Sequence, residues 1–368
     1  MKMLFRCLGG LLVAIGLIAL PLFGVWVKGA PVSRYTEFPP LTHYVEHTGF
    51  SWIAFILCAL AALVLLVPLV LFLCRAWAGR PRAVPAWRFP AWGWFGVGFT
   101  AVAWGLAWTR FPWFAPLQPY TFSPLWLGYI LVVNALTYRR TGACLLTARP
   151  RFFLALFPAS AVFWWYFEYL NRFVQNWVYL GIENMTPVQY FWEATLPFST
   201  VLPAVLGTHE FLAAVLGRPA TSFRLPPPAH IPRRVPALLI GVSALGLAFL
   251  AVFPDLLFPL LWLSPLLLIS GARMLAARPP LDAGPDNDVV RRAALLAAAA
   301  LGCGFFWEMW NFYSLARWEY AVPFVNRFHI FEMPLLGYTG YFPFGIECAL
   351  VGDAIRSWMD RRAAAPHP

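Results

Sequence analysis

The sequence predicts an all-α, polytopic integral membrane protein of about ten transmembrane helices, built from tandem four-helix parallel repeats. The first observation behind this class is composition. Of the residues, 61% are hydrophobic and only 12% are charged, whereas soluble proteins carry about 25% charged residues. The second observation is that positive charge alternates between successive loops. The third is an internal repeat in the second half of the chain.

Ten apolar segments reach the length of roughly 20 residues that crosses the hydrocarbon core of a bilayer. The first has two interpretations. Lys2 and Arg6 before it and Lys28-Gly29-Ala30 after it are typical of a cleaved secretion signal. Its apolar run is longer than a usual signal core, however, and favours a retained anchor. The predicted spans cover residues 4–27, 51–74, 92–109, 122–138, 151–174, 194–216, 235–253, 257–273, 293–313 and 333–355.

The positive charges then divide unevenly across the membrane. Of the 27 Lys and Arg residues, 21 fall on one side of the ten predicted spans and 6 on the other. Because loops rich in Lys and Arg stay in the cytoplasm, both termini are expected there, in a multi-pass protein of a bacterial inner membrane. The net charge of +11 therefore reflects topology, and no nucleic-acid partner is expected. The six outer residues are Lys28, Arg34, Arg110, Arg172, Arg317 and Arg327.

Carboxylates, amides and aromatic residues carry the internal repeat. The first copy contains Glu168-Tyr169-Leu170-Asn171, then Trp177-Val178-Tyr179, then Trp192-Glu193. The second copy contains Glu308-Met309-Trp310-Asn311, then Trp318-Glu319-Tyr320, then Phe331-Glu332. Corresponding residues are between 139 and 141 positions apart. Such a constant offset across a whole unit indicates a duplicated structural element.

The repeat divides the chain into four parts. We predict an N-terminal two-helix segment over residues 1–80, repeat 1 over 81–217, and repeat 2 over 235–368. Between the repeats, residues 218–234 are rich in Pro and Arg and predict a stiff cytoplasmic linker. An even number of spans per repeat means that both enter the membrane in the same sense, so the axis relating them should lie along the membrane normal.

The repeated polar residues predict a site between the repeats. Glu168 lies 17 residues after Arg151, a helical rise of roughly 25 Å, and is therefore expected near the outer edge of the membrane with its counterpart Glu308. Asn171 and Asn311 follow three residues later on the same helical face. Glu193 and Glu332 are expected to open the next spans at that level, where a helix start favours a carboxylate.

Two interpretations of these groups remain open. Carboxyls within spans are costly and indicate function, but they also serve as hydrogen-bonded links between helices. The nearby aromatic residues are either an interfacial belt or the walls of a substrate site. The candidate catalytic residues are Glu168, Glu308, Glu193 and Glu332, and the candidate substrate-binding residues are Asn171, Asn311, Trp177, Tyr179, Trp307, Trp318 and Tyr320.

Residues deeper in the fourth spans give weaker signals. Glu210 and Glu347 are either a second polar layer or simply residues of the inner helix ends. Pro197 and Pro203 predict a broken helix in the first repeat, and the Gly- and Pro-rich stretch 335–345 does so in the second. Broken helices in membranes occur where backbone packs on protein or lines a cavity.

One short motif suggests a metal. His43-Tyr44-Val45-Glu46-His47 reads H-x-x-E-H, in which two histidines on one helical face could bind zinc. Interfacial histidines explain the motif more simply, and no third ligand is evident in the sequence, so no metal site is expected. The six cysteines show no paired spacing. There is no phosphate-binding glycine loop, and no span after Lys28 contains a lysine for a retinal Schiff base. We therefore expect no cofactor.

The repeated order resembles the membrane lycopene cyclase domain family and, more loosely, related carotenoid hydratases. Those proteins are tandem polytopic repeats in which an acidic residue closes one span, a W-x-Y-like loop follows, and Pro and Glu open the next span. Trp307-Glu308, Trp318-Glu319-Tyr320 and Phe331-Glu332-Met333-Pro334 correspond to this order. The resemblance covers residues 88–357 as a pattern, and it implies an isoprenoid substrate.

Three functions follow from these observations. Redox-neutral cyclisation or hydration of a polyene needs an acid kept out of water and aromatic faces that stabilise a carbocation. Its partner would be a membrane lipid or isoprenoid, in a cavity open sideways to the bilayer. A transporter or proton-coupled carrier would use the same carboxylates along a water path that continues inward through Glu210 and Glu347. A non-catalytic membrane scaffold is the third function.

Overall fold

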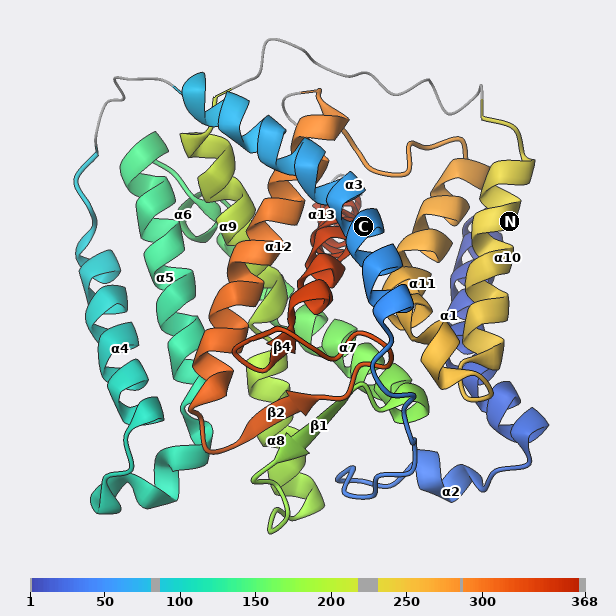
Figure 1. The fold of residues 1–368 in the computed structure, drawn as a ribbon. Coiled ribbons are helices and arrows are strands. Elements are labelled where there is room, and N and C mark those ends of the chain that lie inside the picture. Colours follow the sequence, from blue (N-terminus) through green and yellow to red (C-terminus); the bar gives the residue numbers. More distant parts are fainter. Residues whose placement is uncertain (1, 81–86, 218–230, 285–286, 364–368) are drawn as a thin grey trace.

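The structure is a computed structural model that describes residues 2–80, 87–217, 231–284 and 287–363, with side chains from residue 15 onward. Most of the predicted linker, residues 218–230, lies outside these ranges. The described chain is mostly helical (Figure 1). Its α-helices are α1 Lys2–Lys28, α2 Val32–Tyr35, α3 Trp52–Ala78, α4 Ala91–Trp108, α5 Phe122–Thr141, α6 Leu145–Ala148, α7 Pro150–Val174, α8 Pro187–Phe198, α9 Val201–Val215, α10 Arg234–Phe249, α11 Pro254–Leu275, α12 Val289–Phe312 and α13 Tyr341–Ala363.

Five of these helical segments are long and apolar enough to cross a membrane. They are α3, α7, the consecutive pair α8 and α9, α11, and α12. This combination of length and hydropathy identifies a membrane-embedded protein. The other predicted spans coincide with α1, α4, α5, α10 and α13, and their crossing of the membrane stays a prediction.

The short strands lie at one end of the bundle, the lower end in Figure 1. The all-α class holds for the described chain, to which two short antiparallel pairs, β1 with β2 and β3 with β4, are added. The expected last span, 333–355, also begins later than predicted, because its first residues form β4 and a 3₁₀ helix before α13 starts. The bounds are η1 Pro112–Tyr120, β1 Trp177–Leu180, β2 Arg317–Tyr320, β3 His329–Ile330, β4 Met333–Pro334 and η3 Leu335–Gly340.

The long helices form a central group with a helix pair on each side (Figure 1). The pairs α4–α5 and α10–α11 flank α7, α9, α12 and α13, and α1 packs on α10. In the centre α9 contacts α12, and α13 contacts α7. Buried and partly buried aromatic rings fill this centre: Trp126 lies 4.8 Å from Trp307, and Phe344 lies 5.8 Å from Trp164, centroid to centroid. The core therefore joins the two predicted repeats.

The break between α8 and α9 occurs where the prolines predict it. α8 ends at Phe198 and α9 begins at Val201, between Pro197 and Pro203. Ser160 of α7 satisfies the interrupted backbone, since its hydroxyl donates to the carbonyl of Phe198 over 2.5 Å and accepts the N–H of Leu202 over 3.0 Å. This buried serine supplies the partners that a broken helix needs in an apolar environment.

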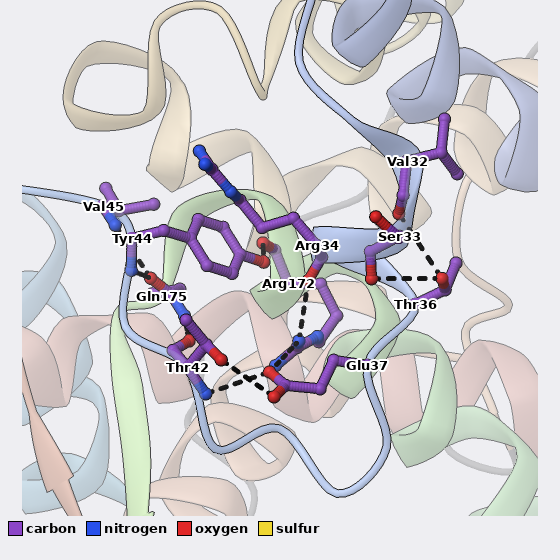
Figure 2. A network of polar contacts seen from close by, with 10 residues as sticks. All are labelled: Val32, Ser33, Arg34, Thr36, Glu37, Thr42, Tyr44, Val45, Arg172 and Gln175. Atoms are coloured by element: carbon purple, nitrogen blue, oxygen red, sulfur yellow. Dashed lines mark hydrogen bonds and ion pairs between the residues drawn. The ribbon is translucent and has the colours of Figure 1, made fainter.

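The segment 29–51 between α1 and α3 is fastened to the end of α7 (Figure 2). Gln175 ends α7 in the left-handed conformation, with φ 48°. Its side-chain oxygen accepts the N–H groups of Tyr44 and Val45 over 2.8 and 2.9 Å, and its amide donates to the Thr42 carbonyl. The Tyr44 hydroxyl donates to the carbonyl of Arg172. These contacts hold the segment across the end of the bundle that carries the strands.

Candidate functional site

Equivalent asparagines position the two strands β1 and β2. Asn171 of α7 donates from Nδ2 to the carbonyl of Trp177 over 2.8 Å and accepts the N–H of Trp177 over 3.4 Å. Asn311 of α12 makes the same two bonds with Trp318, over 2.7 and 2.9 Å. In each case a buried amide replaces the backbone partner that the start of the strand would otherwise lack.

The strands then pair with each other across the molecule. β1 and β2 are antiparallel, with Trp177 opposite Tyr320, Val178 opposite Glu319, and Tyr179 opposite Trp318. This register is symmetric. Trp177 and Trp318 are equivalent residues of the two repeats, as are Tyr179 and Tyr320, and each Trp lies opposite the Tyr of the other strand. The W-x-Y segments, separated by 141 residues, therefore form one two-stranded ribbon.

Glu168 lies behind the ribbon and accepts three hydrogen bonds on one oxygen. Its Oε1 accepts from the hydroxyl of Tyr179 over 2.5 Å, from Nε1 of Trp177 over 3.1 Å, and from Nε1 of Trp164 over 3.0 Å. The side chain is buried, with 6% of its surface exposed. Such bonds to a buried carboxyl fix the orientation of the aromatic rings that donate them.

Glu308 occupies the corresponding place in the second repeat. Its Oε1 accepts from the hydroxyls of Tyr320 and Tyr341, both over 2.8 Å. Trp318 donates from Nε1 to the Tyr320 hydroxyl over 2.9 Å, so the indole contributes indirectly. Glu308 is fully buried, and its Oε2 has no hydrogen-bond partner among the described residues.

The tyrosines of the ribbon remain protonated donors. Burial raises the pKa of Tyr179 well above its ordinary value, and the nearby Glu168 carboxylate raises it further. Burial and Glu308 raise the pKa of Tyr320 in the same way. A phenol whose pKa is raised holds its proton throughout the physiological range. Both hydroxyls are therefore fixed as donors toward the carboxyls.

A cavity of about 530 Å³ lies on the other side of these rings. It falls within the usual volume range of small-molecule sites. Both predicted repeats line it, together with α3 of the N-terminal segment. Five tryptophans and several tyrosines form much of its wall, namely Trp164, Trp177, Trp262, Trp307, Trp318, Tyr179, Tyr190, Tyr320 and Tyr341.

The structure brings part of the predicted site together at this cavity. Of the candidate catalytic residues only Glu193 lines it. Glu168 and Glu308 do not, and instead hold the lining aromatics from behind. Asn171 and Asn311 are likewise outside the lining and support the strands. The predicted substrate-binding residues that do line the cavity are Trp177, Tyr179, Trp307, Trp318 and Tyr320.

Glu193 differs from Glu168 and Glu308 in having no hydrogen-bond partner among the described residues. It lies in the middle of α8 rather than at a helix start, which corrects the predicted position. Its side chain is half-buried and, among the described residues, makes neither a hydrogen bond nor an ion pair. A carboxyl in an apolar wall without a partner is costly, and it is therefore a strong indicator of a ligand or a reaction.

Glu332 is not the structural counterpart of Glu193. It lies in the turn between β3 and β4, before η3, and opens no helix, because the chain pairs as a short ribbon there. Burial raises its pKa, and the negative charge of Glu319 raises it further. It does not line the cavity. The two repeats therefore differ at this position, and of these two glutamates Glu193 alone lines the cavity.

The deeper glutamates each accept a backbone N–H. Glu210 accepts from Leu145 over 2.8 Å, and Glu347 accepts from Leu266, directly after Pro265, over 3.1 Å. Neither lines the cavity. In position they match the second polar layer considered from the sequence. Glu210 satisfies a backbone N–H at the start of α6, and Glu347 satisfies one beside Pro265 within α11.

The H-x-x-E-H motif does not form a helix. Residues 41–51 have no regular secondary structure, so His43 and His47 do not share a helical face. His47 Nδ1 lies 2.6 Å from Oδ1 of Asp255, and its Nε2 lies 3.2 Å from the carbonyl oxygen of Gln175. In the part of the chain that the structure describes, no three His, Cys, Asp or Glu side chains gather into a metal-binding group.

Sequence reasoning missed three cavity residues. Tyr341 bonds to Glu308 from the start of α13, and only the fold brings these two together. Trp262 lies in α11, where no repeated motif marks it. Asn176 follows the α7 cap and lines the cavity, although its neighbour Trp177 was the residue the repeat indicated. Proximity to the W-x-Y segment was the only local signal for Asn176.

Comparison of the chain with protein-family models, with curated proteins and with solved structures found no match.

Proposed function

We propose that this chain is a membrane-embedded enzyme that carries out acid-catalysed, redox-neutral chemistry on an isoprenoid or related lipid. The reaction class is cyclisation or hydration of a carbon–carbon double bond. The observation that carries the proposal is the partnerless carboxyl of Glu193 in a cavity wall made of indole and phenol rings. Acid groups kept from water in an apolar pocket are suited to donate protons.

Glu193 is the proposed catalytic acid. The π electrons of the alkene take the proton of its carboxyl group, which leaves a carbocation on the substrate and a carboxylate on the protein. A second double bond or a water molecule then attacks the cation. Loss of a proton to the carboxylate restores the acid and completes cyclisation or hydration without an oxidant or reductant.

The tryptophan rings are proposed to stabilise the cation. Trp164 and Trp307 line the same cavity, with their ring centroids 6.4 Å apart. Trp262 lines it from α11, 5.3 Å from Trp177. The face of an indole attracts a cation within about 6 Å, and the attraction strengthens when water is excluded. These rings would also hold an apolar substrate before reaction.

Glu168 and Glu308 are proposed to be positioning residues. Each fixes cavity-lining rings by accepting their hydrogen bonds, Glu168 from Trp164, Trp177 and Tyr179 and Glu308 from Tyr320 and Tyr341. A shift of an ångström in a reacting pocket lowers the rate by about a hundredfold. Their replacement should therefore affect turnover through the shape of the cavity.

The topology proposed for this enzyme has ten spans, cytoplasmic termini and two parallel repeats. Three features support a twofold relation between the repeats. The β1–β2 register is symmetric about Val178 and Glu319, the asparagine bonds recur, and the contacts α9–α12 and α13–α7 correspond. The proposed site then lies on the axis, near the outer side of the membrane, in a bacterial inner membrane.

A transporter or carrier is less well supported. Its water path would continue inward from the cavity through Glu210 and Glu347, but both carboxyls accept backbone N–H groups away from the cavity wall. A purely structural scaffold would not need a partnerless carboxyl inside an aromatic cavity. The arrangement at Glu193 therefore favours the enzyme over both alternatives.

The proposal is tested by comparing lipid extracts. Membranes with the wild-type chain, with Glu193→Gln, and with no added protein are extracted and analysed by chromatography and mass spectrometry. We expect the wild-type chain alone to convert an isoprenoid lipid to an isomer of the same mass or to a product that has gained one water. Glu183→Gln is the matched control, because Glu183 is exposed in the loop before α8.

Unchanged lipid profiles across all samples would remove the enzyme proposal. Equal conversion by wild type and Glu193→Gln would show that the protein is an enzyme but that Glu193 is not its catalytic acid. The control variant should match wild type in both membrane abundance and conversion.

A further inference from the structure

α3 forms one side of the cavity and is open to the surroundings of the protein. Cys58, Ala61, Ala62 and Leu65 line the cavity, and their spacing places them on a single helical face. Leu65 is nevertheless 57% exposed, and Cys58 is also exposed. The cavity therefore reaches the outer surface of the bundle beside α3, where the bilayer lies.

α3 is fixed at its two ends rather than along this face. Ser51 donates its N–H to the carbonyl of Phe324 over 2.9 Å at one end. At the other, Leu69 packs with Ala297 and Phe342 in a small buried cluster. In Figure 1 α3 runs obliquely across the front of the other helices. The stretch that covers the cavity lies between these two fastenings.

This stretch has the dimensions and surface of a hydrocarbon-chain subsite. From Cys58 to Leu65 the helix rises roughly 10 Å, at 1.5 Å per residue. The small side chains of Ala61 and Ala62 keep α3 from filling the cavity. Phe258 and Leu263 of α11 line it as well. An apolar chain could lie here with one side toward the bilayer.

One polar group of the cavity wall is an acceptor without a donor. Asn176 is 2% exposed and donates from Nδ2 to the carbonyl of Ala321, but its Oδ1 has no partner among the described residues. A buried acceptor without a donor is costly, so a ligand with a hydrogen-bond donor complements this wall.

The charges of the described lining decide between possible donors. Arg317 lines the cavity and pairs with Glu319 over 3.1 Å, so its charge already has a counter-ion. A charged ammonium group is costly to transfer from water into this largely apolar cavity. A neutral hydroxyl supplies the donor at a smaller desolvation cost.

We infer that the cavity takes a single-chain lipid alcohol, with its hydroxyl at Asn176 and its chain beneath α3, reached sideways from the bilayer. The inference rests on the proposed function in placing the ligand in the same cavity. It adds the chemical class of the ligand's head group, the path of its hydrocarbon chain and the side from which the ligand enters the cavity. It requires binding only, so it can be tested without turnover.

The test uses photo-crosslinking of the purified full-length protein in lipid nanodiscs. Three probes share one diazirine-bearing chain and end in a hydroxyl, an amine or a carboxylic acid. We expect the alcohol to label most strongly, with mass-spectrometric cross-links in the peptide that contains residues 58–65. Asn176→Leu should reduce alcohol labelling about fivefold, as the loss of one hydrogen bond predicts.

Steric variants of α3 provide the second measurement. Ala61→Trp fills the chain subsite and should reduce labelling by all three probes at least about tenfold. Leu60→Trp is the matched control on an exposed, non-lining face of the same helix and should label as wild type. Both variants are first checked by size-exclusion chromatography to elute as folded protein. The cross-link map of the wild type tests the inference independently of any variant.

Three results would overturn the inference: cross-links outside α3 and the cavity, stronger labelling by the amine or the acid, or no effect of Ala61→Trp. If labelling fails while Glu193-dependent lipid conversion occurs, this inference falls and the proposed enzyme stands. If labelling succeeds while no lipid is converted, the binding site stands and the enzyme falls.

Discussion

The hydroxyl of Tyr179 donates a hydrogen bond of 2.5 Å to Oε1 of Glu168, so that a carboxyl of α7 holds a ring of β1 at the cavity wall. Tyr320 donates to Glu308 in the same way over 2.8 Å. The phenols face the cavity, and the carboxyls lie behind them. This order separates the two carboxyls behind the rings from Glu193, the proposed acid, which lines the cavity itself.

Glu168→Gln and Glu308→Gln should each lower lipid conversion by about a hundredfold while leaving membrane abundance normal. Glutamine keeps a carbonyl acceptor for the phenols but adds an N–H₂ group that must find its own partner, which displaces the cavity rings. Lipid analysis and quantitative immunoblots of membranes measure the two effects. Asp282→Asn is the control, since Asp282 pairs with Arg273 away from the cavity and should leave both unchanged. Variants that merely fail to accumulate would make these glutamates structural links only.

Asn171→Ala and Asn311→Ala should each destabilise the protein. Each removes two hydrogen bonds to a strand backbone and leaves buried groups unpaired, a cost of about 1–3 kcal/mol per group. The melting temperature in detergent should fall by several degrees. Asn184→Ala, at an exposed loop position, provides the comparison and should not shift it. Equal melting curves for all four proteins would show that the asparagines do not hold the ribbon.

Acid should loosen the segment 29–51 through Glu37. Partial burial acts to raise the pKa of Glu37, but bonds from the N–H and hydroxyl of Thr42 and the charge of Arg172 outweigh it and lower the pKa overall. A carboxyl whose folded-state pKa is depressed stabilises the fold above its unfolded pKa, and the contribution is lost as pH falls through the folded value. Figure 2 shows these contacts.

Amide exchange of residues 41–46, corrected for intrinsic rates, should therefore quicken as pH falls below about 4.5, the ordinary range of Glu. Glu37→Gln should exchange faster at neutral pH and show little further change on acidification. An unaltered acid dependence in this variant would assign the effect to another group.

Reporter fusions should establish the membrane topology. Ten spans place a reporter after residue 40 outside, and reporters after residues 85, 145, 225 and 285 inside. This expectation rests on the distribution of Lys and Arg, with 21 on one side of the predicted spans and 6 on the other. A cytoplasmic signal at 40, or a periplasmic signal at 225, would contradict the ten-span arrangement.

The H-x-x-E-H motif should not bind zinc in stoichiometric amounts. His47 is engaged by Asp255 and by the Gln175 carbonyl, and the segment is not helical. Elemental analysis of purified protein should show no stoichiometric zinc, and the His43→Ala, His47→Ala double variant should retain lipid conversion. Zinc that is present in wild type and lost in the double variant would reverse this reading.

The sequence by itself determined the helices and the breaks within them. Spans near α3, α7, α11 and α12 follow from local hydropathy and length. The gap between α8 and α9 follows from Pro197 and Pro203, because proline removes a backbone donor wherever it stands. The repeat also marked the right neighbourhood, since Trp177, Tyr179, Trp318 and Tyr320 line one cavity.

Only the tertiary structure decided which acids face that cavity. A helix has several faces, and packing rather than sequence spacing selects the one that turns inward, which is why Glu168 and Glu308 lie behind the rings and Glu193 among them. Likewise, the bond from Tyr341 to Glu308 and the pairing of Val178 with Glu319 join residues far apart in the chain. Strand pairing and side-chain direction are long-range properties, so local pattern could not supply them.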